Sequence, residues 1–173
     1  MTQHRVLASG LQFPEGPIAC ADGSILLVEI ERKTITRVLP GGAVEIVAQL
    51  DGGPNGLALG PDGALYICNN GGFLFQKVSG FNRTKPGVPE SYAGGRIERL
   101  DLKTGQLSVL YTRCGDHPLC GPNDIVFDAH GGFYFTDMGK MYPRMRMNGG
   151  LYYGLADGSR IVDAPVPDLP GGS

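Results

Sequence analysis

A repeated pair of short strands joined by a tight turn constrains the fold of this chain more than any other feature. Three segments superimpose without a gap: 14–29, 54–69 and 122–137. Each has a short apolar run, an Asp-Gly or His-Gly turn, and a second apolar run. Asp-Gly favours a tight hairpin because both central positions of the turn can adopt positive φ. Internal repetition at this spacing is typical of repeat folds such as propellers.

A second predicted hairpin follows each of the first ones. The strand pairs are 33–39 with 43–48, 96–101 with 106–111, and 151–155 with 160–162. Two hairpins per repeat predict a four-stranded meander, and the 40-residue step from Glu15 to Asn55 matches one propeller blade. The 28 Gly and 13 Pro also favour many short strands over helices. The predicted fold is therefore an all-β β-propeller, with about three blades near 12–50, 51–112 and 120–163.

The connections and ends of the repeats give further expectations. Residues 71–93 form a long insert, for which a functional lid and a decorative surface loop both stay open. Residues 4–11 are expected to form a strand that lacks a partner in its own repeat, and 164–173 a frayed tail. Closed propellers have about four to eight blades. We therefore expect 1–173 to be a partial propeller whose exposed blade faces favour self-association.

Composition limits the classes of binding partner and the cellular compartment that we expect. The 173 residues carry a net charge of −2, which gives no reason to expect nucleic acid or an anionic membrane as partner. No apolar run approaches the ~18 residues that span a bilayer, and no secretory signal is recognisable, so a cytoplasmic location is expected. The four cysteines show no metal-ligand spacing, and reduced thiols are expected. A disulfide between Cys114 and Cys120 stays open as an alternative.

Three polar residues occupy one equivalent position, at the start of each repeat's first strand: Glu15, Asn55 and Asn123. In a propeller this strand is innermost, so the three side chains should converge at one end of the channel. Carboxylate and amide oxygens are the ligands that hard cations such as Ca²⁺ and Mg²⁺ prefer. The alternative is turn chemistry, because Pro-Glu-Gly and Pro-Asn-Gly are ordinary turn sequences.

Two further polar sets have simpler interpretations. The residues that end each repeat's second strand are predicted to be solvated: Glu29, Asn69 and Asp137. Three basic residues in a Met-rich stretch could meet an acidic substrate, although a solvated loop is favoured: Lys140, Arg144 and Arg146. Motifs of serine hydrolases, HExxH metalloenzymes and phosphate-binding loops are absent from the sequence.

Several motifs, taken in order, resemble the SMP-30/gluconolactonase-like family. They are Phe13-Pro14-Glu15-Gly16-Pro17, Gly53-Pro54-Asn55-Gly56, Asn69-Asn70-Gly71-Gly72 and Gly121-Pro122-Asn123-Asp124. The similarity covers nearly all of residues 4–163. It implies a six-bladed propeller with one divalent cation in its channel, for which Ca²⁺ is expected and Zn²⁺, Mn²⁺ and Mg²⁺ are alternatives. It also implies hydrolysis of small-molecule lactones.

The resemblance assigns roles to individual residues. Glu15 matches the family's glutamate metal ligand, and Asn123 matches an asparagine that contacts substrate or the water on the metal; Asn55 is a second substrate-binding candidate. Gly121 stands where some members have arginine. The family's remaining metal ligands, including the aspartate proposed as acid/base, would lie beyond Ser173, so the catalytic residue is unknown here. The implied chemistry is cation polarisation of the lactone carbonyl and activation of a water.

Two other functional classes compete with a lactonase. One is a non-catalytic NHL-like propeller that binds a partner through its blade faces, and the other is a strictosidine-synthase-like propeller. Glu15 discriminates between them, because a binding module has no need of a carboxylate at the channel mouth.

Overall fold

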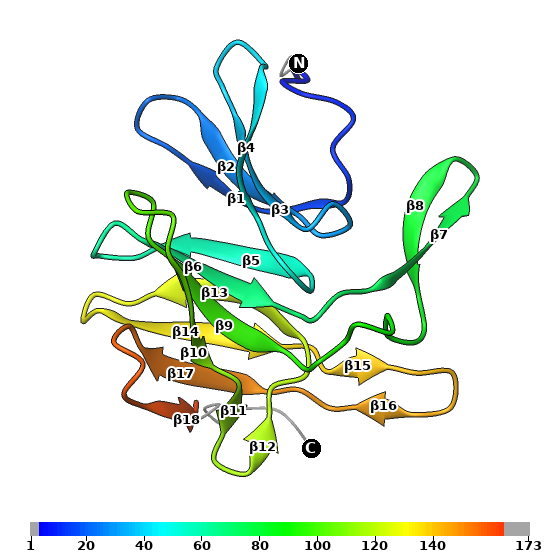
Figure 1. Cartoon of the computed structure of the whole chain (residues 1–173), viewed down its shortest axis with the longest axis vertical. Coiled ribbons are helices and arrows are strands. Elements are labelled where there is room, and N and C mark those ends of the chain that lie inside the picture. Colours follow the sequence, from blue (N-terminus) through cyan, green and yellow to red (C-terminus); the bar gives the residue numbers. More distant parts are fainter. Residues whose placement is uncertain (1–3, 165–173) are drawn as a thin grey trace, which may run out of the picture.

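The structure, a computed structural model, describes residues 4–164, and strands are its only extended regular elements (Figure 1). Three four-stranded antiparallel sheets follow one another along the chain. The first sheet has the order β1 (Pro14–Ala19), β2 (Ile25–Glu29), β3 (Thr34–Val38) and β4 (Val44–Gln49). Within the described residues there is no helix long and apolar enough to cross a membrane.

The second and third sheets repeat this meander. The second consists of β5 (Pro54–Leu59), β6 (Leu65–Asn69), β9 (Arg96–Leu100) and β10 (Leu107–Tyr111). The third consists of β13 (Pro122–Phe127), β14 (Gly132–Asp137), β17 (Leu151–Leu155) and β18 (Ile161–Asp163). The all-β prediction is confirmed, and each sheet contains both hairpins expected from its repeat.

Three small hairpins project from the sheets. The insert forms β7 (Leu74–Val78) and β8 (Phe81–Lys85), between β6 and β9. Two more were not foreseen from the sequence: β11 (Arg113–Cys114) with β12 (His117–Pro118), and β15 (Lys140–Met141) with β16 (Arg146–Met147). Figure 1 shows that β7–β8 and β15–β16 extend toward the same side of the molecule.

The core lies between neighbouring sheets rather than within one. Val28 and Ile35 of the first sheet pack in one cluster with Ile67 of the second. Ile97 of the second sheet packs in another cluster with Phe133 of the third. Each sheet therefore buries its apolar face against the next one, as propeller blades do.

The expectations about the two chain ends have different outcomes. The predicted strand over 4–11 is wrong: this segment forms no strand, because no neighbouring edge in the described chain pairs with it. The predicted tail, 164–173, lies outside the described residues except for Ala164, whose N–H donates to Leu151 O at 2.8 Å.

All four cysteines are free thiols, so Cys114 and Cys120 form no disulfide.

Candidate functional site

The innermost strands β1, β5 and β13 bring the three predicted site residues into one cleft. Glu15, Asn55 and Asn123 all line this cleft, which has a volume of about 420 Å³. Asn55 is 6% exposed, Asn123 is half-buried and Glu15 is exposed. The shared position in the three repeats thus becomes a shared position in space.

A hydrogen bond between two sheets fixes the amide groups. Asn55 Nδ2 donates to Asn123 Oδ1 at 2.9 Å, across 68 positions of the sequence. This bond leaves Asn55 Oδ1 as a free acceptor and Asn123 Nδ2 as a free donor among the described residues. The pair can therefore offer one oxygen to a cation and one N–H to an anionic or carbonyl oxygen.

Glycine after the first two site residues allows the inner strands to come close. A Cβ on Gly16 would lie 2.7 Å from Asn55 O, and a Cβ on Gly56 would collide with the backbone of Asn123 and Asp124. Pro-Glu-Gly and Pro-Asn-Gly are therefore more than turn sequences here, since the glycine makes room for the neighbouring blade.

The prediction that the residues ending each second strand are solvated is wrong, and Asp137 shows why. Its Oδ1 accepts hydrogen bonds from the N–H groups of Gly121 and Gly139, and its Oδ2 accepts one from Cys120 N–H, each at 2.7 Å. Cys120 and Gly121 lie immediately before Pro122-Asn123. The carboxylate therefore fixes the backbone that delivers Asn123 to the cleft.

Asn69 does the same for the second sheet. Its Oδ1 accepts from Gly53 N–H at 2.9 Å and Gly71 N–H at 3.0 Å. Its Nδ2 donates to Asp51 O at 2.7 Å and to Glu98 Oε2 at 2.9 Å. Gly53 lies two residues before Asn55, so this fully satisfied amide holds the approach to Asn55.

Glu29 is the equivalent residue of the first sheet. Its Oε2 accepts from Gln12 N–H at 2.6 Å, and its Oε1 accepts from Thr36 Oγ1 at 2.7 Å. Arg32 Nε lies 3.2 Å from Oε2. The side chain is fully buried and ties down the segment before Glu15. All three residues are positioning groups for the cleft, and none of them is a solvated strand end.

One cleft residue was missed in the sequence. Asp124 lines the cleft, is exposed, and accepts a hydrogen bond from Ile125 N–H through Oδ1 at 2.9 Å. It occupies the position of Gly16 and Gly56. The signal was present in the aligned repeats, since an aspartate replaces glycine only in the third repeat.

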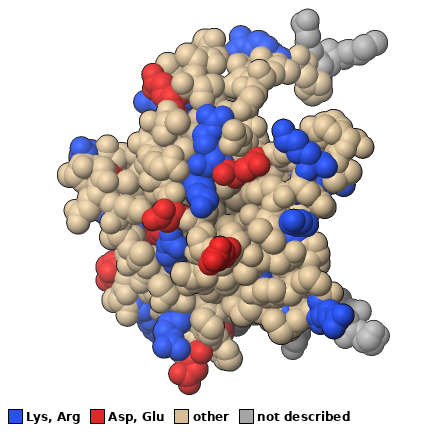
Figure 2. Space-filling model, turned by 45° about the vertical axis from the view of Figure 1, so that its right-hand side comes forward, with Lys and Arg blue, Asp and Glu red and all other residues tan. Residues whose placement is uncertain are grey.

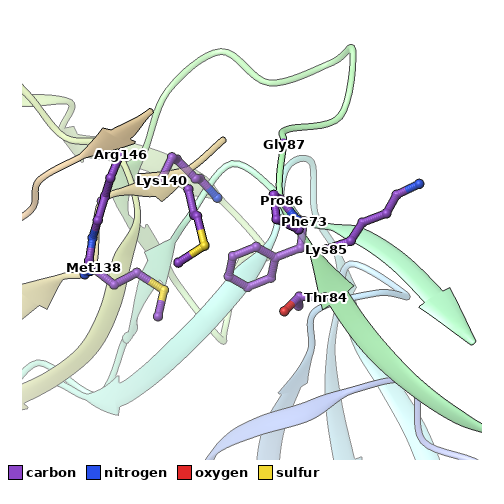
Figure 3. A pocket seen from close by; sticks show the side chains of 10 residues that line it. Phe73, Thr84, Lys85, Pro86, Gly87, Met138, Lys140 and Arg146 are labelled. Carbon is purple, nitrogen blue, oxygen red and sulfur yellow. The ribbon is translucent and has the colours of Figure 1, made fainter. Parts of the chain in front are cut away.

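Among the three basic residues of the Met-rich stretch, the structure contradicts the prediction for one. Arg144 and Arg146 are exposed, as expected. Lys140 is 3% exposed and lines a second pocket, between the β7–β8 and β15–β16 hairpins (Figure 3). Burial lowers the pKa of Lys140 from 10.5 to about 8, and the negative charge of Asp137 partly offsets this lowering. This pocket shares no lining residue with the cleft.

Charges of both signs are interspersed over the face seen in Figure 2, with no single-sign patch dominating it.

Comparison with known proteins identifies the family. A model of the SMP-30/gluconolactonase/LRE-like region matches residues 13–166, which is most of the chain. The chain belongs to this family. The matched region contains every residue of the cleft, and the family resemblance seen in the motifs is confirmed.

Individual relatives agree with this assignment. A gluconolactonase from Zymomonas mobilis is 27% identical over 150 residues, which is 79% of this chain and 36% of the relative. The structure of a gluconolactonase from Xanthomonas campestris superimposes with a TM-score of 0.67 at 19% identity, covering 92% of this chain and 49% of that one. A chain of a nidogen–laminin complex gives a TM-score of 0.60 at 22% identity, covering 91% and 50%. These two structural likenesses show the fold alone. The chain spans about half of each matched structure and about a third of the curated relative.

The donor set of the cleft fits part of a cation shell. Glu15 offers a carboxylate and Asn55 offers a free amide oxygen, both of which are ligands for hard cations. Within residues 4–164, no cluster of three or more His, Cys, Asp or Glu side chains could hold a metal. Ca²⁺ takes six to eight oxygens, so these residues can supply only a fraction of a full shell.

Proposed function

We propose that this chain contributes to the divalent-cation-dependent hydrolysis of a small-molecule lactone and that it holds only part of the site. The observation that supports the proposal most directly is the convergence of Glu15, Asn55 and Asn123 in one cleft, with the two amides joined across sheets. Family membership supports the reaction class, because a curated relative is a gluconolactonase.

Each residue of the cleft has a distinct task in this proposal. Glu15 provides the negative charge that holds the cation, and Asn55 Oδ1 provides a neutral ligand. Asn123 uses its Oδ1 in the hydrogen bond with Asn55, so its Nδ2 can donate to an oxygen of the lactone and orient the substrate. When bound, the cation would act as a Lewis acid toward the lactone carbonyl and lower the pKa of a water. Asp124 is the second carboxylate among the residues that line the cleft.

The donors present suggest weak cation binding by this chain alone. The two carboxylates of the cleft, Glu15 and Asp124, and one or two amide oxygens still leave much of a calcium shell to water or to another polypeptide. Calcium affinity falls as ligand charge and site rigidity fall. We therefore expect slow cation-dependent turnover from the isolated chain, well below that of a complete site.

An assay of lactone hydrolysis tests the function. Hydrolysis of glucono-1,5-lactone would be measured for the purified chain with Ca²⁺, Mn²⁺, Zn²⁺ or Mg²⁺, and corrected for spontaneous ring opening. We expect cation-dependent acceleration that is lost in Glu15→Gln and retained in Glu45→Gln, which changes an exposed glutamate on β4. Acceleration that is equal in both variants would show that the cleft does not perform the reaction.

A further inference from the structure

The pocket around Lys140 contains a buried cation that has no anionic partner. Lys140 Nζ donates to Gly72 O at 2.8 Å and lies 3.4 Å from Asn70 Oδ1, both of them neutral oxygens. It also lies 4.4 Å from the centroid of the Phe73 ring and 5.2 Å from that of Tyr92. Among residues 4–164, no carboxylate approaches it within salt-bridge distance.

The nearest candidate for a counter-ion is already engaged. Asp137 raises the pKa of Lys140 through space, but its two oxygens accept three backbone N–H groups. Asn70, which is also fully buried, keeps its Nδ2 without any hydrogen-bond partner. Of these two neighbouring buried donors, Asn70 Nδ2 thus has no acceptor, and Lys140 has neutral acceptors but no anionic partner. Buried groups of this kind are costly unless something pairs with them.

The space beside Lys140 suits a small apolar body. The pocket has a volume of about 280 Å³, near the lower end of small-molecule sites. Its lining includes Phe73, Met138 and Met141 together with Arg146, and it contains no Asp or Glu. Figure 3 shows Met138 and Phe73 facing the pocket from opposite sides, whereas Lys85 points away from it.

The two walls of the pocket belong to hairpins that are tied together. Gly87 N–H, which follows β8, donates to Met141 O of β15 at 2.8 Å. Lys140 joins the loop before β7 to the same hairpin. The pocket is therefore a fixed feature between two projecting elements, although neither hairpin forms a layer of the core.

We infer that this pocket binds a small organic monocarboxylate, with the carboxylate at Lys140 and Arg146 and an apolar body between Phe73 and Met138. An anion would pair with the buried ammonium, and the thioether and aromatic side chains would cover the rest of the ligand. The site is separate from the Glu15 cleft and does not depend on lactone hydrolysis.

Binding of two isosteric probes tests the inference. Phenylacetate and phenylacetamide would be titrated into the isotope-labelled chain, with the methyl signals of Met138 and Met141 as the readout. We expect both signals to shift and phenylacetate to bind about tenfold more tightly, since a hydrogen bond to a charged group is worth about that much. Equal affinities, or shifts elsewhere only, would overturn the inference.

Variants test which positive charge produces the preference for phenylacetate over phenylacetamide. In Lys140→Met the preference for acid over amide should fall severalfold, because only Arg146 then remains to pair with the carboxylate. Lys103→Met, at the exposed β9–β10 turn, should retain the full preference. If Lys140→Met does not fold, Arg146→Met provides the same comparison at an exposed residue and should reduce the preference. A preference that is undiminished in a folded Lys140→Met chain, or in Arg146→Met where Lys140→Met is unfolded, contradicts the assignment.

A pH series gives an independent readout on the unmodified chain. Lys140 loses its proton as the pH rises through about 8, whereas phenylacetate stays anionic, so its affinity should fall about tenfold from pH 7 to 9. The other titratable groups that face Lys140 are Asp137, Cys120 and Tyr92; burial raises the pKa of both the Cys120 thiol and the Tyr92 phenol. Phenylacetamide affinity should stay constant, and a parallel fall for both probes would overturn the inference.

Discussion

At the scale of the residue, Asp137 shows how one buried side chain sets the position of another. Its carboxylate accepts three backbone N–H groups and so fixes the turn before Asn123. Asp137→Ala should lower the free energy of unfolding by about 3 kcal/mol, because three buried donors lose their acceptor. Urea denaturation would measure this, with Asp116→Ala in an exposed loop as the control. Similar losses in the two variants would show that Asp137 is not a clamp.

Lys140 makes the stability depend on pH with a defined sign. Its pKa is about 8 in the folded chain, against an ordinary value of 10.5. Between these values the unfolded chain binds a proton that the folded chain does not, so stability from this group rises with pH. Below pH 8 the group is protonated in both states, and its unfavourable contribution is constant.

This linkage predicts a difference between the wild type and Lys140→Met. From pH 8 to 10.5 the wild type should gain roughly 2.5 kcal/mol relative to the variant. Urea unfolding of both proteins at several pH values would measure the difference, and titrations common to the two proteins cancel. A constant difference over this range would mean that Lys140 titrates normally.

At the scale of the element, the close approach of the inner strands requires glycine, which has no side chain. Gly56 allows β5 to approach β13, and an added Cβ there would meet the backbone of Asn123 and Asp124. Gly56→Ala should therefore destabilise the chain by roughly 2–4 kcal/mol and shift the side-chain amide signals of Asn55 and Asn123.

Gly41→Ala is the matched control for this prediction. Gly41 lies in the turn between β3 and β4, and a Cβ there would meet nothing within 4 Å. It should be close to neutral in thermal or urea unfolding. If Gly56→Ala is equally neutral, the inner strands can separate and the spacing of the cleft is not set by glycine.

The sequence predicted the strands well because their signals are local. Asp-Gly turns such as Asp62-Gly63 and alternating apolar residues are read within a few positions, and all six hairpins of the sheets follow from them. The convergence of Asn55 and Asn123 also follows, because equivalent positions in stacked repeats lie near one another. The β15–β16 hairpin, with two-residue strands, has no comparable local pattern.

The roles of the buried polar groups could not be predicted in the same way. Asn69 was expected in water, yet its partners include the backbone of Asp51 and Gly53, 18 and 16 positions earlier in the sequence. Burial of Lys140 likewise depends on Gly72, 68 positions earlier. Such contacts depend on how loops that are distant in the sequence pack together. A single sequence does not show this packing, because the same polar residue could equally be solvated.

At the scale of the whole molecule, the outermost sheets expose apolar side chains. Ile46 on β4 is 56% exposed and Val126 on β13 is 62% exposed. Large exposed apolar surface on blade faces favours association with a second copy. Light scattering should show concentration-dependent self-association that Val126→Asp weakens. Val78→Asp, on the projecting β7 strand, should leave it unchanged, and a monomer at all concentrations would contradict this expectation.

The most direct test of the central claim is to find where a divalent cation binds. In an isotope-labelled chain titrated with Mn²⁺, paramagnetic broadening should reach the side-chain amide signals of Asn55 and Asn123 before that of the exposed Asn148. The effect should persist in Glu45→Gln and disappear in Glu15→Gln, because Glu15 supplies the carboxylate that is proposed to hold the cation. Broadening that ignores the cleft, or that survives in Glu15→Gln, would contradict a cation site formed by Glu15, Asn55 and Asn123.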